Sequence, residues 1–175
     1  MIKLNVIEPS FGQPIKTIYF IDEQDYCFRV GYLLDDELVL DEVQEFNKSK
    51  QKINETLFDG SYNVLAYINY LRDSADTYIG KDEYQVIGGH HVKICSMRFS
   101  ENLSGSEGLR QNWFNASGEL VYYSEPDIDG LKIYKSNGEE YKYEEQLHIF
   151  FSEVKLKGYS DVLNEHLKRI IKENT

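Results

Sequence analysis

Two neighbouring histidines suggest a possible metal site in this chain. His90 and His91 are followed by Cys95, and His148 lies further along. Imidazole and thiolate groups are the ligands that zinc prefers. Adjacent residues of a strand point to opposite faces of a sheet, however, so the two neighbours are poorly placed to share one ion. Because no carboxylate or cysteine stands at a recognised zinc spacing around them, we predict no metal site and no cofactor.

A short acidic segment resembles the opening of a calcium-binding loop. Glu125, Asp127 and Asp129 occupy the first, third and fifth positions, and Gly130 follows at the sixth. The twelfth position of such a loop should carry a bidentate glutamate, but here it is Ser136. Since strand patterns flank the segment, we interpret it as an acidic turn whose carboxylates point at solvent.

No motif of a known catalytic mechanism occurs in the chain. Gly88 and Gly89 precede a strand pattern, whereas a phosphate-binding glycine loop opens a helix. Neither a Gly-x-Ser-x-Gly elbow nor a Cys-His signature surrounds any nucleophile. A pair of carboxylates brought together in space would suffice for a glycosidase, and the chain has 30 acidic residues. Its modest size and single tryptophan weigh against that alternative, so we predict no enzyme and no catalytic residues.

The charge of the chain indicates what kind of partner it attracts. Its formal net charge is −11, with residues 22–45 contributing −8 and residues 119–145 contributing −5, while residues 155–172 carry +3. Nucleic acids and anionic membrane surfaces repel such a protein. A basic protein is instead steered toward it. We therefore predict a basic protein partner, with no nucleic acid and no membrane.

Several features of the sequence predict a cytoplasmic protein. The N-terminal residues lack the uninterrupted apolar stretch of a signal peptide. No segment is apolar over a membrane-spanning length. The two cysteines, Cys27 and Cys95, are more typical of reduced and buried thiols than of a disulfide when no secretion signal is present.

The first part of the chain combines strand patterns with two helical ones. Alternating apolar residues predict strands over residues 15–21 and 26–33, and the segment 91–99 has the same pattern. A four-then-three spacing of apolar residues predicts a helix over residues 41–58, although this region could also begin as a strand. A further helix is predicted from Ser61 onward, and its apolar face consists of Val64, Leu65, Ile68 and Leu71.

The second part is organised around an internal repeat of two hairpins. Residues 113–123 align with residues 133–143 at an offset of 20, so that Gly118 matches Gly138. The dipeptide Asn137-Gly138 is a strong hairpin signal. We therefore predict a tyrosine-rich antiparallel meander that begins near Leu109 and continues through residues 146–154.

An amphipathic helix is predicted to end the chain. Ser160 can cap it, and Leu163, Leu167 and Ile170 form an apolar stripe that should be largely buried. Together the patterns predict one α+β domain over residues 1–175. It should consist of a curved antiparallel sheet of about six to eight strands, packed with two or three helices.

This profile of a small, acidic, tyrosine-rich protein without catalytic motifs favours a binding function. We predict that it neutralises a basic protein, most specifically as a bacterial immunity protein or antitoxin that inhibits a toxin nuclease. The alternative is a small ligand-binding or hydrolytic domain with a pocket in the curved sheet. The predicted partner-binding residues are Glu125, Asp127, Asp129, Trp113, Tyr122 and Tyr123.

Overall fold

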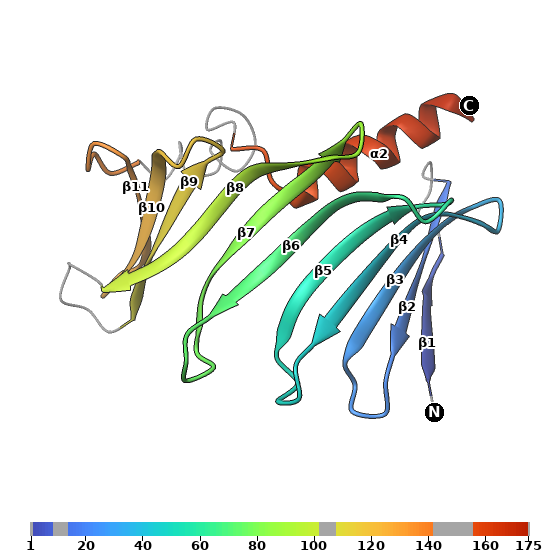
Figure 1. Cartoon of the computed structure of the whole chain (residues 1–175), viewed down its shortest axis with the longest axis horizontal. Coiled ribbons are helices and arrows are strands. Elements are labelled where there is room, and N and C mark those ends of the chain that lie inside the picture. The colour runs from blue at the N-terminus through green and yellow to red at the C-terminus, as the bar shows by residue number, and fades with distance from the viewer. Residues whose placement is uncertain (1, 9–13, 102–107, 142–155, 175) are drawn as a thin grey trace. The chain divides into compact units, whose positions relative to one another are not determined.

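The computed structural model of this chain describes residues 2–8, 14–101, 108–141 and 156–174. These residues form an 11-stranded antiparallel sheet, in which each strand lies beside the next one in the chain, and one helix (Figure 1). The elements are β1 (Lys3–Ile7), β2 (Ile15–Ile21), β3 (Cys27–Leu34), β4 (Glu37–Phe46), β5 (Lys52–Asp59), β6 (Val64–Arg72), β7 (Tyr78–Ile87), β8 (His90–Glu101), β9 (Leu109–Asn115), β10 (Leu120–Asp127), β11 (Gly130–Lys135) and α2 (Tyr159–Glu173).

The predicted α+β fold with six to eight strands and two or three helices is wrong, because the described residues form eleven strands and a single helix. The helix predicted over residues 41–58 is the hairpin of β4 and β5, which are joined by a turn that begins at Asn47. The helix predicted from Ser61 is strand β6. In the first case the helical spacing arose from two strands that were read continuously through their turn.

One type of hairpin turn recurs along the chain. It spans five residues: the first N–H donates to the fifth carbonyl, and the fourth N–H donates to the first carbonyl. The fourth residue always has a positive φ, as at Lys50 and Gly118. This pattern is that of a turn closed by a residue in the left-handed conformation. The turns begin at Asp22, Asn47, Asp59, Asp73, Asn115 and Lys135.

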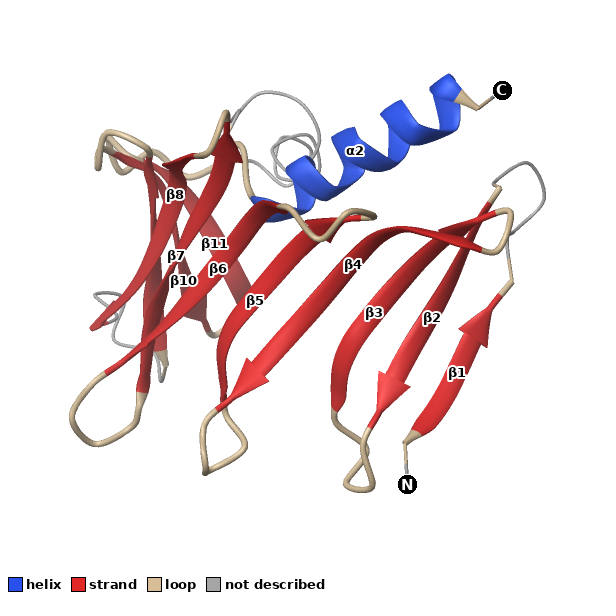
Figure 2. Ribbon diagram, turned by 45° about the vertical axis from the view of Figure 1, so that its right-hand side comes forward, coloured by secondary structure: helices blue, strands red, loops and turns tan. Residues whose placement is uncertain are grey.

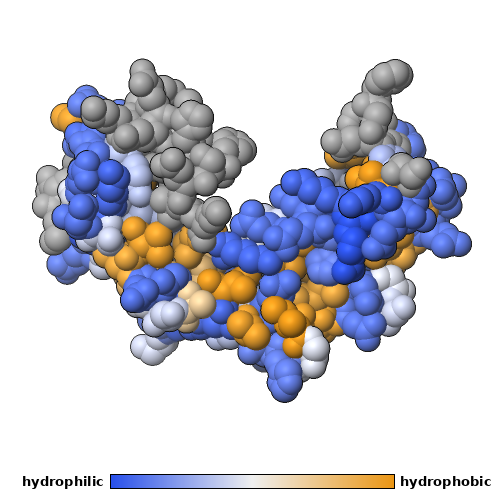
Figure 3. All heavy atoms as spheres, turned by 90° about the horizontal axis from the view of Figure 1, so that it is seen from above, coloured by the Kyte–Doolittle hydropathy of each residue, from blue (hydrophilic) through white to orange (hydrophobic). Residues whose placement is uncertain are grey.

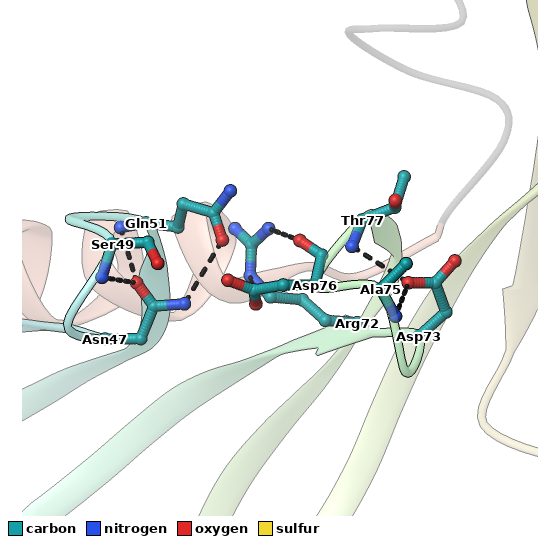
Figure 4. Close-up of polar contacts among 8 residues, drawn as sticks. All are labelled: Asn47, Ser49, Gln51, Arg72, Asp73, Ala75, Asp76 and Thr77. Carbon is teal, nitrogen blue, oxygen red and sulfur yellow. Dashed lines mark hydrogen bonds and ion pairs between the residues drawn. The ribbon is translucent and has the colours of Figure 1, made fainter.

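The first side chain of the turn explains why the sequence bends at these places. Asn47 Oδ1 accepts hydrogen bonds from the N–H groups two and four residues further on, at 3.0 and 2.9 Å. Asp73 makes the same two contacts in its own turn (Figure 4). Short Asx side chains stabilise turns in this way. Five of the six turns described above begin with Asp or Asn.

The predicted repeat corresponds to two of these turns. The turns at Asn115 and Lys135 have the same backbone hydrogen bonds, and Gly118 and Gly138 take φ angles of 83° and 87° at equivalent positions. The meander of β9, β10 and β11 is confirmed. Its predicted continuation over residues 146–154 lies outside the described residues.

The chain divides into two compact units. The first comprises Met1–Asn69, Tyr84–Val92 and Tyr159–Thr175, and the second comprises Tyr70–Glu83 and Lys93–Gly158. The single domain predicted over residues 1–175 stays a prediction.

In the first unit, strands β3 to β6 bury one face, which we call the core face. Successive residues of a strand point to opposite sides of a sheet. Glu42 pairs with Val30 on one side and Leu57 on the other, so these side chains share the core face. Its buried apolar residues are Val30, Leu40, Leu57, Ala66 and Ile68.

The predicted C-terminal helix is confirmed as α2, which lies beside the strands of the first unit (Figure 2). Its burial differs from the expectation. Leu163, Leu167 and Ile170 are only half-buried, whereas Tyr159 and Val162 are the buried residues. The helix is therefore anchored mainly by its first turn. The Tyr159 ring is buried in the core, and its hydroxyl forms a hydrogen bond with a polar side chain there.

Candidate functional site

An exposed acidic turn joins β3 to β4. Asp35 and Asp36 have φ angles of 50° and 65°, and Leu34 pairs with Glu37 across the turn. Two successive residues with positive φ are typical of the tight turns that connect antiparallel strands, and aspartate tolerates this conformation. The three acidic side chains that follow Leu34 are all exposed. A hydrogen bond and ion pair with Lys16 at 2.7 Å lower the pKa of the Asp36 carboxyl.

The turn between β5 and β6 lies close to the first residues of β4, next to the β3–β4 turn. A Cβ added to Gly60 would lie 2.7 Å from the carbonyl oxygen of Leu38, so only glycine lets the backbone approach this closely. This turn begins with Asp59 and carries Tyr62, which is 62% exposed. Partial burial opposes ionisation of Asp59, but hydrogen bonds from Asn63 and the N–H of Ser61 outweigh it and lower the pKa of the carboxyl.

These two turns lie at the same end of the first unit (Figure 1). We call their acidic residues, together with Tyr62, the acidic rim, which consists of Asp35, Asp36, Glu37, Asp59 and Tyr62. Figure 3 shows hydrophilic residues over much of the visible surface, with hydrophobic patches between them.

The aromatic residues that were predicted to bind a partner lie on both faces of the second unit. Trp113 and Tyr122 stack with their ring centroids 5.7 Å apart. Burial raises the pKa of the Tyr122 hydroxyl. Tyr123 points to the opposite face, where its ring stacks on Tyr134 at 4.9 Å and lies 3.4 Å from the Arg110 guanidinium. As expected from strand alternation, Tyr122 and Tyr123 cannot serve the same face.

The acidic turn of the second unit is less exposed than expected. Glu125 is only 6% exposed and forms an ion pair with Arg110, whose Nη1 lies 3.6 Å from Oε1. Asp127 forms an ion pair with Lys132. Asp129 is exposed. The expectation that all three carboxylates point at solvent is therefore wrong for Glu125, which is buried and paired with Arg110 of the neighbouring strand β9.

A pair of buried carboxyl groups lies on the core face of the first unit. Glu42 is 7% exposed and Glu55 is 9% exposed, and their side chains are hydrogen-bonded. The Tyr159 hydroxyl donates to Glu42 Oε2 at 3.1 Å, and Lys52 Nζ lies 3.0 Å from Glu55 Oε2. Burial and the neighbouring Glu55 together raise the pKa of Glu42 to about 7. Glu42 is thus partly protonated near neutral pH.

Sequence patterns missed this pair because they placed both residues in one helix. Read as strands, Glu42 lies two residues after the buried Leu40, and Glu55 lies two residues before the buried Leu57. That period of two would have predicted both carboxyl groups on the core face.

The histidines do not come together as a metal centre within the described part of the chain. His90 and His91 are exposed, and His91 Nδ1 lies 3.2 Å from the Tyr67 hydroxyl. No group of three or more metal-ligating side chains occurs among these residues, and His148 lies outside them. Cys27 and Cys95 are free thiols, as predicted, but only Cys95 is buried, and Cys27 is half-buried.

Comparison with models of protein families finds no match for this chain, and comparison with curated proteins finds none that is similar to it. Within the described ranges, no helix is long and apolar enough to cross a membrane. Function must therefore be inferred from the residues and their geometry.

Proposed function

We propose that this chain is an acidic binding protein that neutralises a basic protein partner, most specifically a bacterial immunity protein or antitoxin that inhibits a toxin nuclease. The observation that supports this proposal best is the acidic rim. It consists of three exposed carboxylates, the half-buried Asp59 and one exposed tyrosine, on two adjacent turns of the first unit. Carboxylates steer a basic partner toward the surface, and a tyrosine adds contact area with little loss of conformational freedom.

The local structure of the rim favours binding because the β5–β6 turn is fixed by its own contacts before a partner arrives. Asp59 accepts two backbone hydrogen bonds of its own turn, at 2.9 and 2.8 Å. The close approach of Gly60 to β4 holds this turn against the neighbouring strand. A preorganised surface loses less conformational entropy on binding than a flexible one.

The nuclease version of the proposal follows from charge complementarity. A nuclease binds phosphate groups through a basic cleft. A protein with a net charge of −11 and an exposed row of carboxylates is complementary to such a cleft. Occupying the cleft would exclude the nucleic acid and so inhibit the enzyme.

The hydrolytic alternative depends on the Glu42 and Glu55 pair, since two carboxyl groups with separated pKa values are the usual acid and base of a glycosidase. Both side chains are buried on the core face, and the Tyr159 hydroxyl donates a hydrogen bond to Oε2 of Glu42. A substrate would have to displace α2 to reach them. The geometry therefore favours the binding function.

The experiment begins with co-purification from the native host and identification of the bound protein by mass spectrometry. Association rates with the purified partner are then measured across a salt series for the rim variant D35N/D36N/E37Q. Asparagine tolerates the positive φ of this turn, so the fold should be kept. We expect association to slow by roughly tenfold at low salt and to lose much of its salt dependence.

A matched control removes the same charge from exposed acids elsewhere, in the variant E45Q/E101Q/E140Q. A second comparison, D127N/D129N, tests the turn that was predicted from the sequence. If the rim variant slows association no more than the charge-matched control, the rim is not the binding surface. If the protein that co-purifies is not basic, the proposed function fails as a whole.

A further inference from the structure

The first turn of α2 is attached to the sheet at the buried carboxyl pair. Tyr159 and Val162 are the two buried residues of the helix, and the remainder is half-buried or exposed. The Tyr159 hydroxyl donates to Glu42 Oε2. The docking of α2 therefore depends on the state of a buried titratable group, in addition to the packing of its apolar residues.

Within the described ranges, several elements bring a polar or titratable group to Glu42. On its own strand, Gln44 Nε2 lies 3.5 Å from Oε1. On β5 the neighbour is Glu55. The groups contributed by β3 and α2 are the Tyr32 hydroxyl, the Cys27 thiol and the Tyr159 hydroxyl.

Among the residues that the structure describes, the cation that contacts this cluster is Lys52, and it lies against Glu55. Lys52 Nζ contacts Glu55 Oε2 at 3.0 Å, and the two residues are on the same strand. The side chains that donate hydrogen bonds to Glu42 are the uncharged Gln44 and Tyr159. A negative charge on Glu42 is consequently poorly compensated, because it is buried and lies beside a second carboxylate.

We propose that the Glu42 and Glu55 pair is a proton-controlled latch for α2. When the pair holds one proton, its carboxyl groups hydrogen-bond to each other and the first turn of the helix docks over them. When both groups are ionised, two like charges face each other in a buried site, and release of the helix lets water solvate them.

The direction of the pH dependence follows from the raised pKa. Glu42 titrates at about 7 with the helix docked, against an ordinary value of 4.5. A group with a raised pKa contributes stability that is complete below its ordinary value and is lost as pH rises through the raised one. Docking should thus be tightest below about pH 4.5, weaken progressively up to about pH 7, and change little above that.

Hydrogen exchange of the α2 amides at pH 5 and pH 8, corrected for the chemical exchange rate, tests the latch. For the wild-type chain we expect protection of the helix to be lower at pH 8, by on the order of 50-fold if docking alone limits exchange. Amides of β3 and β5 are the internal reference: they should stay more protected than α2 at pH 8, whereas exchange through global unfolding would give the helix and the strands the same protection. Equal protection of α2 at the two pH values would overturn the proposal.

Two variants separate the latch from a merely structural contact. Glu42→Gln imitates the protonated acid, so protection of α2 should be the same at both pH values. Tyr159→Phe keeps the ring but removes the donor that favours ionised Glu42, so its protection should be nearly normal at pH 5 and fall further than in the wild type at pH 8. A pH dependence that persists in Glu42→Gln, or an equal loss at both pH values in Tyr159→Phe, would show that the pair does not control the helix.

Discussion

The buried ion pair between β3 and β4 allows a quantitative test of the first unit. Asp41 has only 2% of its side chain exposed, and Arg29 Nε donates to its Oδ1 at 2.8 Å. The guanidinium also lies 5.0 Å from the centroid of the Phe20 ring. Replacing Arg29 by methionine keeps most of the apolar stem and removes the charge. The Asp41 carboxylate is then left buried without its cation.

Breaking a buried ion pair by removing one partner costs about 3–5 kcal/mol. The side chain of Arg29 is 32% exposed, so water can partly replace the lost cation. We therefore expect Arg29→Met to lower the free energy of unfolding by about 3 kcal/mol, a large share of the ~5–15 kcal/mol that stabilises a typical domain. Urea denaturation at pH 7, followed by circular dichroism, measures this change.

A surface ion pair of similar geometry is the control for this experiment. Lys3 Nζ lies 2.7 Å from Asp25 Oδ1, and both side chains are exposed. Lys3→Met should change stability by less than about 1 kcal/mol. The double variant Arg29→Met/Asp41→Leu should recover most of the loss, because neither charge is then buried. If Arg29→Met is no more destabilising than Lys3→Met, Asp41 does not depend on its arginine.

Three further outcomes are expected. Because the pKa of Glu42 is raised to about 7, the free energy of unfolding should fall by up to roughly 3 kcal/mol between pH 4.5 and pH 7.5, and urea denaturation of Glu42→Gln should show little of this slope. Val162→Ala, at a fully buried position, should destabilise the fold by about 2 kcal/mol in the same assay. This loss should exceed that of Leu167→Ala, because Leu167 is only half-buried. Gly80→Ala should disrupt folding far more than Gly88→Ala, as measured by thermal denaturation, since a Cβ at Gly80 would lie 2.2 Å from a carbonyl oxygen of β8 whereas one at Gly88 meets nothing within 4 Å.

Parts of the fold could be predicted because they depend on local sequence. The C-terminal helix has an apolar stripe, a capping serine and basic residues in its last turns, and all three favour the same structure. The hairpins of the second unit were found through an internal repeat whose glycines take the same backbone conformation. Such signals act within a few residues, so tertiary contacts are not needed to interpret them.

The two helices wrongly predicted in the first part of the chain show how a spacing argument fails. Apolar residues on either side of the turn at Asn47 happen to fall at helical intervals. The asparagine carries the opposite signal, because its side chain accepts two backbone hydrogen bonds in a turn. The segment from Val64 to Arg72 is rich in β-branched and aromatic residues and has its buried positions at a period of two, at Ala66 and Ile68. Turn chemistry and side-chain type outweigh a helical spacing here.

The candidate sites were predictable to different degrees for the same reason. Exposed acids of the β3–β4 turn fall within the acidic segment 22–45 that the charge distribution had indicated. The burial of Glu125 depends on Arg110, which belongs to another strand. No count of charges along the chain distinguishes an acid that faces solvent from one that is covered by a neighbouring strand.

The contact between Tyr159 and Glu42 joins residues 117 positions apart, whereas each strand of the sheet pairs with its neighbour in the chain. Short hairpins can form early, since closing a small loop loses little entropy, but α2 can dock only after the core face exists. The last element of the chain is thus held by a distant, titratable residue of an already formed sheet. A helix attached in this way can be released while the hairpins beneath it stay intact. That order of assembly is why a proton on Glu42 can control α2 without unfolding the strands that carry the acidic rim.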